Sequence, residues 1–244
     1  MSLCHNPKLP LVVSLRLCHV RANAAPMPIS VLIAHDFVLS TALEAAWMDE
    51  LPLDRRIQIS RWPSVRSRHR SLIASRLLRE GLRQFGHRGT VLASLRYTPR
   101  GRPTLDLPVD FSISHCEGRV VCAVSTDGSI GVDVEAIGTL TGDDFPRYLN
   151  DGERAWAGRD PRRFCAVWTR KEAVAKAAGA DSLDKLRDID TRPAGEDAAF
   201  AGQLWQTSAL DMGSAHVAHL AFRNRCATRV SSAWLELDLC IDRA

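Results

Sequence analysis

The order of the expected secondary-structure elements constrains the fold of this chain most strongly. Apolar and β-branched residues predict a strand over Ile29–Ala34, and an apolar stripe interleaved with arginines predicts a helix over Val65–Phe85. Two strands, over Phe111–Ser114 and Val120–Ser125, follow that helix. Because the order of strand, helix and strands returns after Gly128, we expect an α+β fold of two similar halves, with ligands bound at the seam between them.

The remaining expected elements complete these two halves. The first half should also contain a short helix over Thr41–Asp49, a strand over Val91–Tyr97 and a loop over Thr98–Pro108. The second should contain strands over Ile130–Glu135, Gly202–Thr207, His216–Phe222 and Ser232–Leu239, helices around Asp144–Leu149, Gly152–Ala157 and Pro161–Ala178, and a polar loop over Thr191–Ala199. We place the halves at residues 28–128 and 129–244, after a disordered extension over 1–27.

Composition limits the class of protein. Hydrophobic residues make up 45% and charged residues 25% of the chain, which is ordinary for a globular protein. The net charge of +4 is compatible with an anionic ligand or an acidic partner. The 7 cysteines include no Cys-x-x-Cys pair, which argues against a disulfide framework or a zinc site and predicts a cytoplasmic protein. No stretch approaches the roughly 18 apolar residues that a membrane span requires.

Paired carboxylates stand on the strand expected at Ile130–Glu135. Side chains alternate along a strand, so Asp133 and Glu135 point to one face and the neighbouring valines to the other. Two parallel carboxylates repel each other unless a cation lies between them, and hard oxygen ligands favour Mg²⁺, or Mn²⁺. The alternative is an ordinary amphipathic strand whose polar face lies in water.

A second functional candidate is the helix that contains Phe164–Lys176. Residues four apart share a helix face, so Trp168, Glu172 and Lys176 line one side of it. We expect Trp168 to pack rather than to react. Glu172 and Lys176 alone would also fit a solvated ion pair on the surface.

Two further segments and several arginines offer ligands for phosphate. Ser114 and His115 end an expected strand, and Arg102 lies between a glycine and a proline that would fix its loop. The guanidinium group presents a planar fork of donors suited to phosphate. Upstream cationic candidates are Arg55, Arg61 and Arg70. Taken alone, His115 fits a structural histidine that forms hydrogen bonds. Each arginine taken alone fits a solvated surface residue.

Taken together and in order, four motifs resemble those of the 4′-phosphopantetheinyl transferase superfamily. The motifs are Gly101-Arg102-Pro103, Phe111-Ser112-Ile113-Ser114-His115, Gly131-Val132-Asp133-Val134-Glu135 and the stretch Trp168–Lys176. They are most similar to the larger, pseudo-dimeric type that activates peptide and polyketide synthases. The resemblance covers about Arg55 to Gly179 and implies a pseudo-dimer of two similar α/β halves with coenzyme A at their interface.

The resemblance also implies a reaction and roles for residues. The phosphopantetheine arm of coenzyme A would pass to a serine of an apo acyl, peptidyl or aryl carrier protein, and adenosine 3′,5′-bisphosphate would leave. Asp133, Glu135 and Glu172 match the residues that hold Mg²⁺, while Glu172 and Lys176 match the catalytic pair. The positions that match coenzyme A contacts are Arg55, Arg70, Arg102, Pro103, Ser114 and His115. Whether Glu172 is the base or only a metal ligand stays open.

Other functions are weighed against this transferase. A coenzyme A-binding but inactive scaffold is suggested by Asp181, which stands where the family often has a glycine. A nucleic-acid-binding module would use the arginine-rich region, but aromatic residues are only 6% of the chain and no nucleic-acid motif is present. We therefore expect no nucleic acid or membrane partner, and a monomer, because a pseudo-dimeric chain contains both halves of its site.

Overall fold

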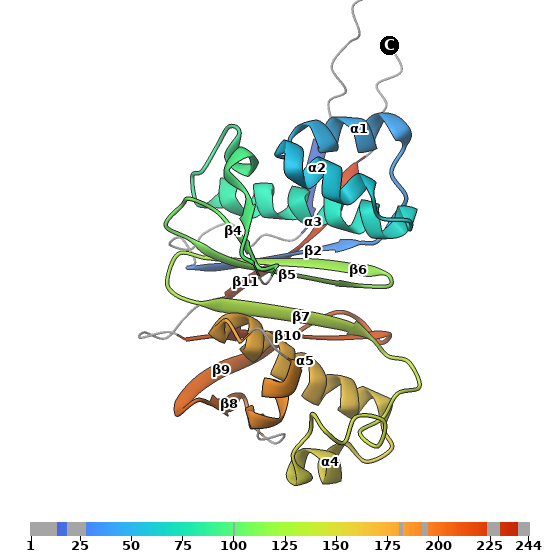
Figure 1. The fold of residues 1–244 in the computed structure, drawn as a ribbon, viewed down its shortest axis with the longest axis vertical. Coiled ribbons are helices and arrows are strands. Elements are labelled where there is room, and N and C mark those ends of the chain that lie inside the picture. The colour runs from blue at the N-terminus through green and yellow to red at the C-terminus, as the bar shows by residue number, and fades with distance from the viewer. Residues whose placement is uncertain are drawn as a thin grey trace, which may run out of the picture.

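The protein consists of two packed β-sheets with helices on their outer faces (Figure 1). The computed structural model describes residues 14–18, 28–99, 101–180, 183–191, 195–223 and 230–238, with the backbone alone described at 14–18 and 235–238. The first sheet has the strand order β1-β11-β2-β6-β5 and the second β7-β10-β9-β8. Helices α1, α2 and α3 cover the first sheet, while α4 and α5 lie on the far side of the second (Figure 1). The predicted α+β architecture of two halves is confirmed.

The first sheet and its helices come mainly from the N-terminal part of the chain. Its strands are β1 (Ser14–Cys18), β2 (Ile29–His35), β5 (Asp110–Cys116), β6 (Arg119–Ser125) and β11 (Val230–Asp238). The helices of this half are α1 (Thr41–Asp49), α2 (Leu53–Ser60) and α3 (Val65–Gln84), followed by the 3₁₀ turn η1 (Val91–Ser94) and the two-residue strands β3 (Arg96–Tyr97) and β4 (Pro103–Thr104).

The second half is built on a four-stranded sheet. Its strands are β7 (Ile130–Ala136), β8 (Asp197–Phe200), β9 (Gln203–Leu210) and β10 (His216–Phe222), and its helices are α4 (Asp151–Ala157), α5 (Pro161–Ala178) and the 3₁₀ helix η2 (Leu183–Asp188). Helix α5 has strong local signals at both ends. Asp160 caps its first N–H groups, Pro161 occupies the first turn, and Gly179 ends it in the left-handed conformation.

The inner faces of the two sheets form one apolar core. Val31 and Val121 of the first sheet share this cluster with Val132, Val134 and Leu220 of the second. Alternate residues of β7 therefore point into the seam, and the residues between them point toward α5. The core thus decides which face of β7 carries Asp133.

The C-terminal strand crosses the seam and joins the first sheet. β11 pairs in parallel with β2 and antiparallel with β1. The boundary expected at residues 128 and 129 therefore does not separate the two sheets, because the second segment supplies a strand to the first. The extension expected to be disordered over 1–27 contains β1, while 1–13 and 19–27 lie outside the described residues.

Several expected elements differ from those observed. Residues 91–97 form η1 and the short β3 rather than one strand, and Asp144–Leu149 forms turns rather than a helix. Helix α2 was not expected from the sequence. It buries only Ile59, so its sequence shows almost no apolar periodicity. The polar loop expected over Thr191–Ala199 contains the start of β8, with 192–194 outside the described residues.

Within the described ranges, no helix combines the length and the apolar character needed to cross a bilayer.

Candidate active site at the seam

Helix α5 lies unusually close to β7. A Cβ atom placed on Gly131 would lie 2.0 Å from the carbonyl oxygen of Ala173 and 2.6 Å from the backbone nitrogen of Ala177. No residue with a side chain fits there while the helix keeps its position, so glycine is required by the packing. This close approach brings the last turns of α5 over Asp133, two residues further along the strand.

Asp133 is the centre of a buried polar cluster. Its Oδ1 accepts hydrogen bonds from the Lys176 ammonium at 2.6 Å and from the Ser114 hydroxyl at 2.7 Å. The ammonium also donates to Ser114 Oγ and to the carbonyl of Val132, each at 3.2 Å. Asp133 is only 4% exposed, so the alternative of a strand face in water is wrong for this residue. The physical reason is that α5 covers this face.

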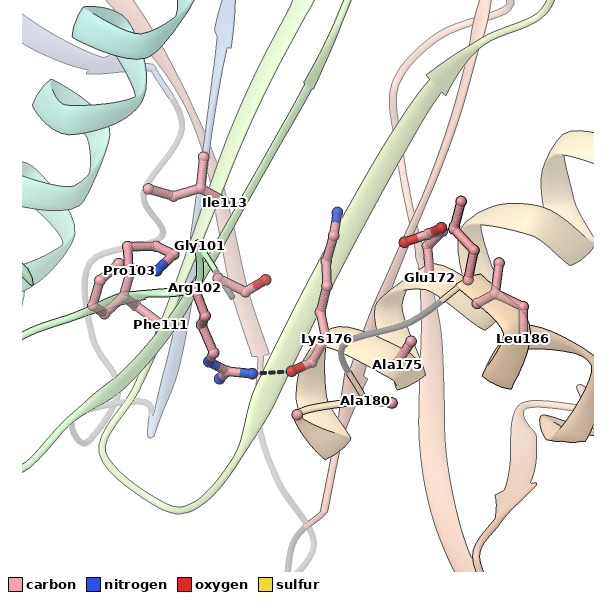
Figure 2. A pocket seen from close by; sticks show the side chains of 13 residues that line it. Gly101, Arg102, Pro103, Phe111, Ile113, Glu172, Ala175, Lys176, Ala180 and Leu186 are labelled. Atoms are coloured by element: carbon pink, nitrogen blue, oxygen red, sulfur yellow. Dashed lines mark hydrogen bonds between the residues drawn. The ribbon is translucent and has the colours of Figure 1, made fainter. Parts of the chain in front are cut away.

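Glu135 and Glu172 add two further carboxyl groups around Asp133. Burial, together with repulsion from Asp133, raises the pKa of Glu135 to about 7, against a partial lowering by Lys176. Burial also raises the pKa of Glu172, and Lys176 and Asp133 act on it in opposite directions. Figure 2 shows the Glu172 carboxylate directed toward β7. Lys176 forms its ion pair with Asp133 on that strand. The alternative interpretation of the sequence, a solvated surface ion pair between Glu172 and Lys176, is therefore wrong.

The predicted three-carboxylate metal site is not preassembled. Among the described residues, no group of three His, Cys, Asp or Glu side chains is close enough to hold an ion. Lys176 supplies the positive charge beside Asp133 instead. The residues nevertheless fit a hard cation. Asp133 Oδ2 is buried without a hydrogen-bond partner, and burial, followed by repulsion from Asp133, disfavours the charged forms of Glu135 and Glu172 and so raises their pKa values, a cost that a bound cation would offset.

A cavity of about 350 Å³ opens beside this cluster, between the two halves (Figure 2). Glu172 and Lys176 line one wall, and Arg102 and Pro103 line the other. The guanidinium of Arg102 donates to both carboxylate oxygens of Asp110, at 2.9 and 3.0 Å, and to the backbone carbonyl of Lys176. Arg102 therefore connects the two walls.

A second cavity, of about 170 Å³, adjoins the first through shared lining residues, Pro103 and Ile113. Arg55 lies in it with its guanidinium carbon 4.5 Å from the centre of the Tyr97 ring and 5.2 Å from that of Trp62. Its nitrogens donate to Gln58 and Ser71, and burial lowers the pKa of the guanidinium. Two aromatic rings thus hold a cation at the cavity wall.

His115 and Arg70 lie near this second cavity. His115 is part of its lining, and burial, aided by Arg70 and Lys176, lowers the pKa of the imidazole so that it is neutral at pH 7. Arg70 donates to the fully buried carboxylate of Asp36 at 2.6 Å, and Arg66 lies 3.8 Å from the same oxygen. Arg70 is therefore engaged by a carboxylate, which sequence reasoning did not foresee.

The structure thus brings most of the predicted residues to one seam. Arg55, Arg102, Pro103, His115, Glu172 and Lys176 line the two cavities, and Ser114, Asp133 and Glu135 surround the end of Lys176. Sequence reasoning missed Tyr97, Trp62 and Asp110. Asp110 is the first residue of β5 and directly precedes the Phe-Ser-Ile-Ser-His motif, and this position was the available signal.

The fold and the site together define a two-sheet α+β protein with acidic and basic side chains gathered at the seam. Comparison with known proteins shows what this chain is similar to. Residues 129–223 match the family model of the 4′-phosphopantetheinyl transferase superfamily, which covers Asp133, Glu135, Glu172 and Lys176. The 4′-phosphopantetheinyl transferase gsp of Aneurinibacillus migulanus is 29% identical over 124 residues, 49% of this chain and 52% of that protein. Residues 129–223 are therefore similar to the 4′-phosphopantetheinyl transferase superfamily, and the chain spans about half the length of this relative.

Proposed function

We propose that this protein transfers the 4′-phosphopantetheine arm of coenzyme A to a serine of an apo acyl, peptidyl or aryl carrier protein, and releases adenosine 3′,5′-bisphosphate. The observation that carries the proposal is the cluster of Asp133, Lys176 and Ser114, with Glu135 and Glu172 beside it, on the edge of a cavity between the two halves. The match of residues 129–223 to the family model and the similarity to the related transferase support the same reaction.

Coenzyme A would bind along the two adjoining cavities. In our proposal Arg102 and Arg55 receive the 3′-phosphate end of the nucleotide, and Ser114 and His115 contact its phosphates. Neutral His115 can donate one N–H to a phosphate oxygen without adding charge. The pyrophosphate would then lie over Lys176, whose ammonium already points toward Ser114. Arg70 would act on this site through Asp36 and His115 rather than by direct contact.

Mg²⁺, or Mn²⁺, would be held by Asp133, Glu135 and Glu172, with the free Oδ2 of Asp133 as the first ligand. When bound, such an ion neutralises the charge of the pyrophosphate. The residues of the chain supply the remaining chemistry. The serine hydroxyl oxygen attacks the phosphorus that bears the pantetheine arm, and the bond to the bridging oxygen breaks.

Proton transfer falls to Glu172 and Lys176. Glu172 accepts the serine proton, directly or through a water molecule, because its carboxylate is directed toward β7 (Figure 2), where Asp133 and Glu135 lie. Lys176 stabilises the leaving phosphate oxygen. We further propose that the protein acts as a monomer in the cytoplasm. One chain supplies both walls of the cavity, and Cys116, Cys122 and Cys165 are free thiols.

The test is incubation with coenzyme A, Mg²⁺ and a panel of apo carrier proteins, followed by mass spectrometry of the carriers. We expect a phosphopantetheine adduct on at least one carrier, and its loss in Asp133→Asn. The exposed Glu117, on the turn between β5 and β6, offers a matched control, because Glu117→Gln removes one carboxylate outside the cluster. Tight binding of coenzyme A without an adduct on any carrier would contradict the proposal and favour the inactive scaffold.

A further inference from the structure

Besides the apolar core that the two sheets share, side chains of β5 join the two halves in place of a continuous backbone ladder. Three alternate residues of β5 (Asp110, Ser112 and Ser114, here called the seam ladder) accept hydrogen bonds from backbone N–H groups of β7 through their side chains. The pairs are Ile130 N to Asp110 Oδ2 at 2.9 Å, Val132 N to Ser112 Oγ at 3.0 Å and Val134 N to Ser114 Oγ at 3.4 Å. These bonds set how the first half sits on the second.

Each end of the seam ladder also holds a side chain of the candidate site. Ser114 donates to Asp133 and accepts from Lys176. At the other end, both oxygens of Asp110 accept from the same guanidinium nitrogen of Arg102. The second terminal nitrogen of Arg102 reaches the carbonyl of Lys176 in the last turn of α5. Arg102 is therefore held at three acceptor atoms, two on β5 and one across the seam.

We infer that Asp110 is a positioning residue, which fixes the Arg102 guanidinium in the cavity wall so that it meets the 3′-phosphate of coenzyme A. This inference rests on the proposed function. A free arginine side chain loses rotamer freedom when a ligand orders it, and that loss weakens binding by about two- to tenfold for each such side chain. A guanidinium already held by Asp110 avoids the loss.

The negative charge of Asp110 has an opposite effect, which is smaller. Arg102 and Asp110 are 27% and 32% exposed at their side chains, so water and salt screen the repulsion between Asp110 and a phosphate. The loss of rotamer freedom is not screened. The balance therefore predicts that removing the Asp110 charge weakens phosphate binding, whereas an acidic residue that only repels the ligand would predict the reverse.

The experiment measures binding of coenzyme A and of dephospho-coenzyme A, which lacks the 3′-phosphate, by titration calorimetry on the full chain. In Asp110→Asn an amide oxygen in the place of Oδ2 can still accept from the Ile130 N–H, so the seam ladder is kept, while the grip on Arg102 loses one acceptor oxygen and the negative charge. We expect Asp110→Asn to weaken coenzyme A binding about fivefold and dephospho-coenzyme A binding by less than about twofold. Asp106→Asn, which removes the same charge from an exposed position of the preceding loop, should leave both affinities unchanged.

Two further variants separate positioning from charge and from general damage. Asp110→Glu keeps the charge but moves the carboxylate by one methylene, so it should also weaken coenzyme A selectively. In an Arg102→Gln background, Asp110→Asn should have no additional effect, because its partner is gone. Tighter coenzyme A binding in Asp110→Asn, or equal weakening of both ligands, would overturn the inference.

The outcome for the wild-type protein separates the two proposals. Wild-type protein that binds neither ligand would overturn the proposed function, and with it this inference. Wild-type protein that prefers coenzyme A, with the same preference in Asp110→Asn, would overturn only the role of Asp110. Wild-type protein that binds both ligands equally would also overturn the inference, because no side chain then reads the 3′-phosphate.

Discussion

Gly131→Ala is predicted to push α5 away from β7 and thereby to disconnect the site. The new Cβ atom would stand 2.0 Å from the carbonyl oxygen of Ala173 and 2.6 Å from the nitrogen of Ala177. Both are backbone atoms of the helix, so no rotamer change relieves the contact. Ordinary contact begins at 3.4 Å, and α5 must therefore recede by about 1.4 Å at this point.

That displacement carries Lys176 away from Asp133. Their hydrogen bond of 2.6 Å would lengthen to about 4 Å, beyond the range of a hydrogen bond. Overpacking of this kind costs about 1–3 kcal/mol of stability. A misplacement of about 1 Å between reacting groups lowers turnover by roughly 10²-fold. We expect a modest loss of stability and a large loss of turnover, with a smaller effect on coenzyme A binding, because Arg55 and His115 lie outside α5.

The assay combines urea unfolding with carrier-modification rates at saturating coenzyme A. Gly138→Ala is the matched control, because a Cβ there meets no atom within 4 Å and Gly138 is not among the glycines with positive φ. The control should match the wild type in both measurements. If Gly131→Ala has wild-type turnover, or loses turnover only because it is unfolded, the link between helix approach and site geometry is refuted.

Three further predictions concern charged residues. Glu135 has a folded pKa of about 7 against an ordinary value of 4.5, so between these values the folded state holds more protons and metal-free stability falls as pH rises. Glu135→Gln should therefore raise the melting temperature at about pH 8 in chelator, with a gain that shrinks toward pH 4.5; a gain independent of pH would contradict this. Lys176→Ala should lower turnover more than it weakens coenzyme A binding, and equal losses would indicate binding alone. Lys171 forms a fully buried ion pair with Glu153 at 2.7 Å, so Lys171→Met should cost about 3–5 kcal/mol in urea unfolding, and Glu153→Gln in the same chain should recover part of it, because the amide removes the unpaired charge and its oxygen can still accept from Thr191.

Local sequence signals were sufficient for the main elements. Helices over Thr41–Asp49 and Pro161–Ala178 were predicted with their observed bounds, because side-chain caps, a first-turn proline and a C-terminal glycine act within a few residues. Strand alternation likewise placed Val132 and Val134 in the core and Asp133 on the opposite face.

Contacts between distant segments needed the tertiary structure. The pairing of β11 with β2, the ion pair of Lys176 with Asp133 and the hold of Asp110 on Arg102 join residues that are far apart in the chain or lie on different elements. Spacing decides which side chains share a face, but it does not decide which neighbour covers that face. By itself the sequence determined the residue types of the site and the faces that carry them. Only the packing of α5 on Gly131 decided that Asp133 is buried and bound to lysine.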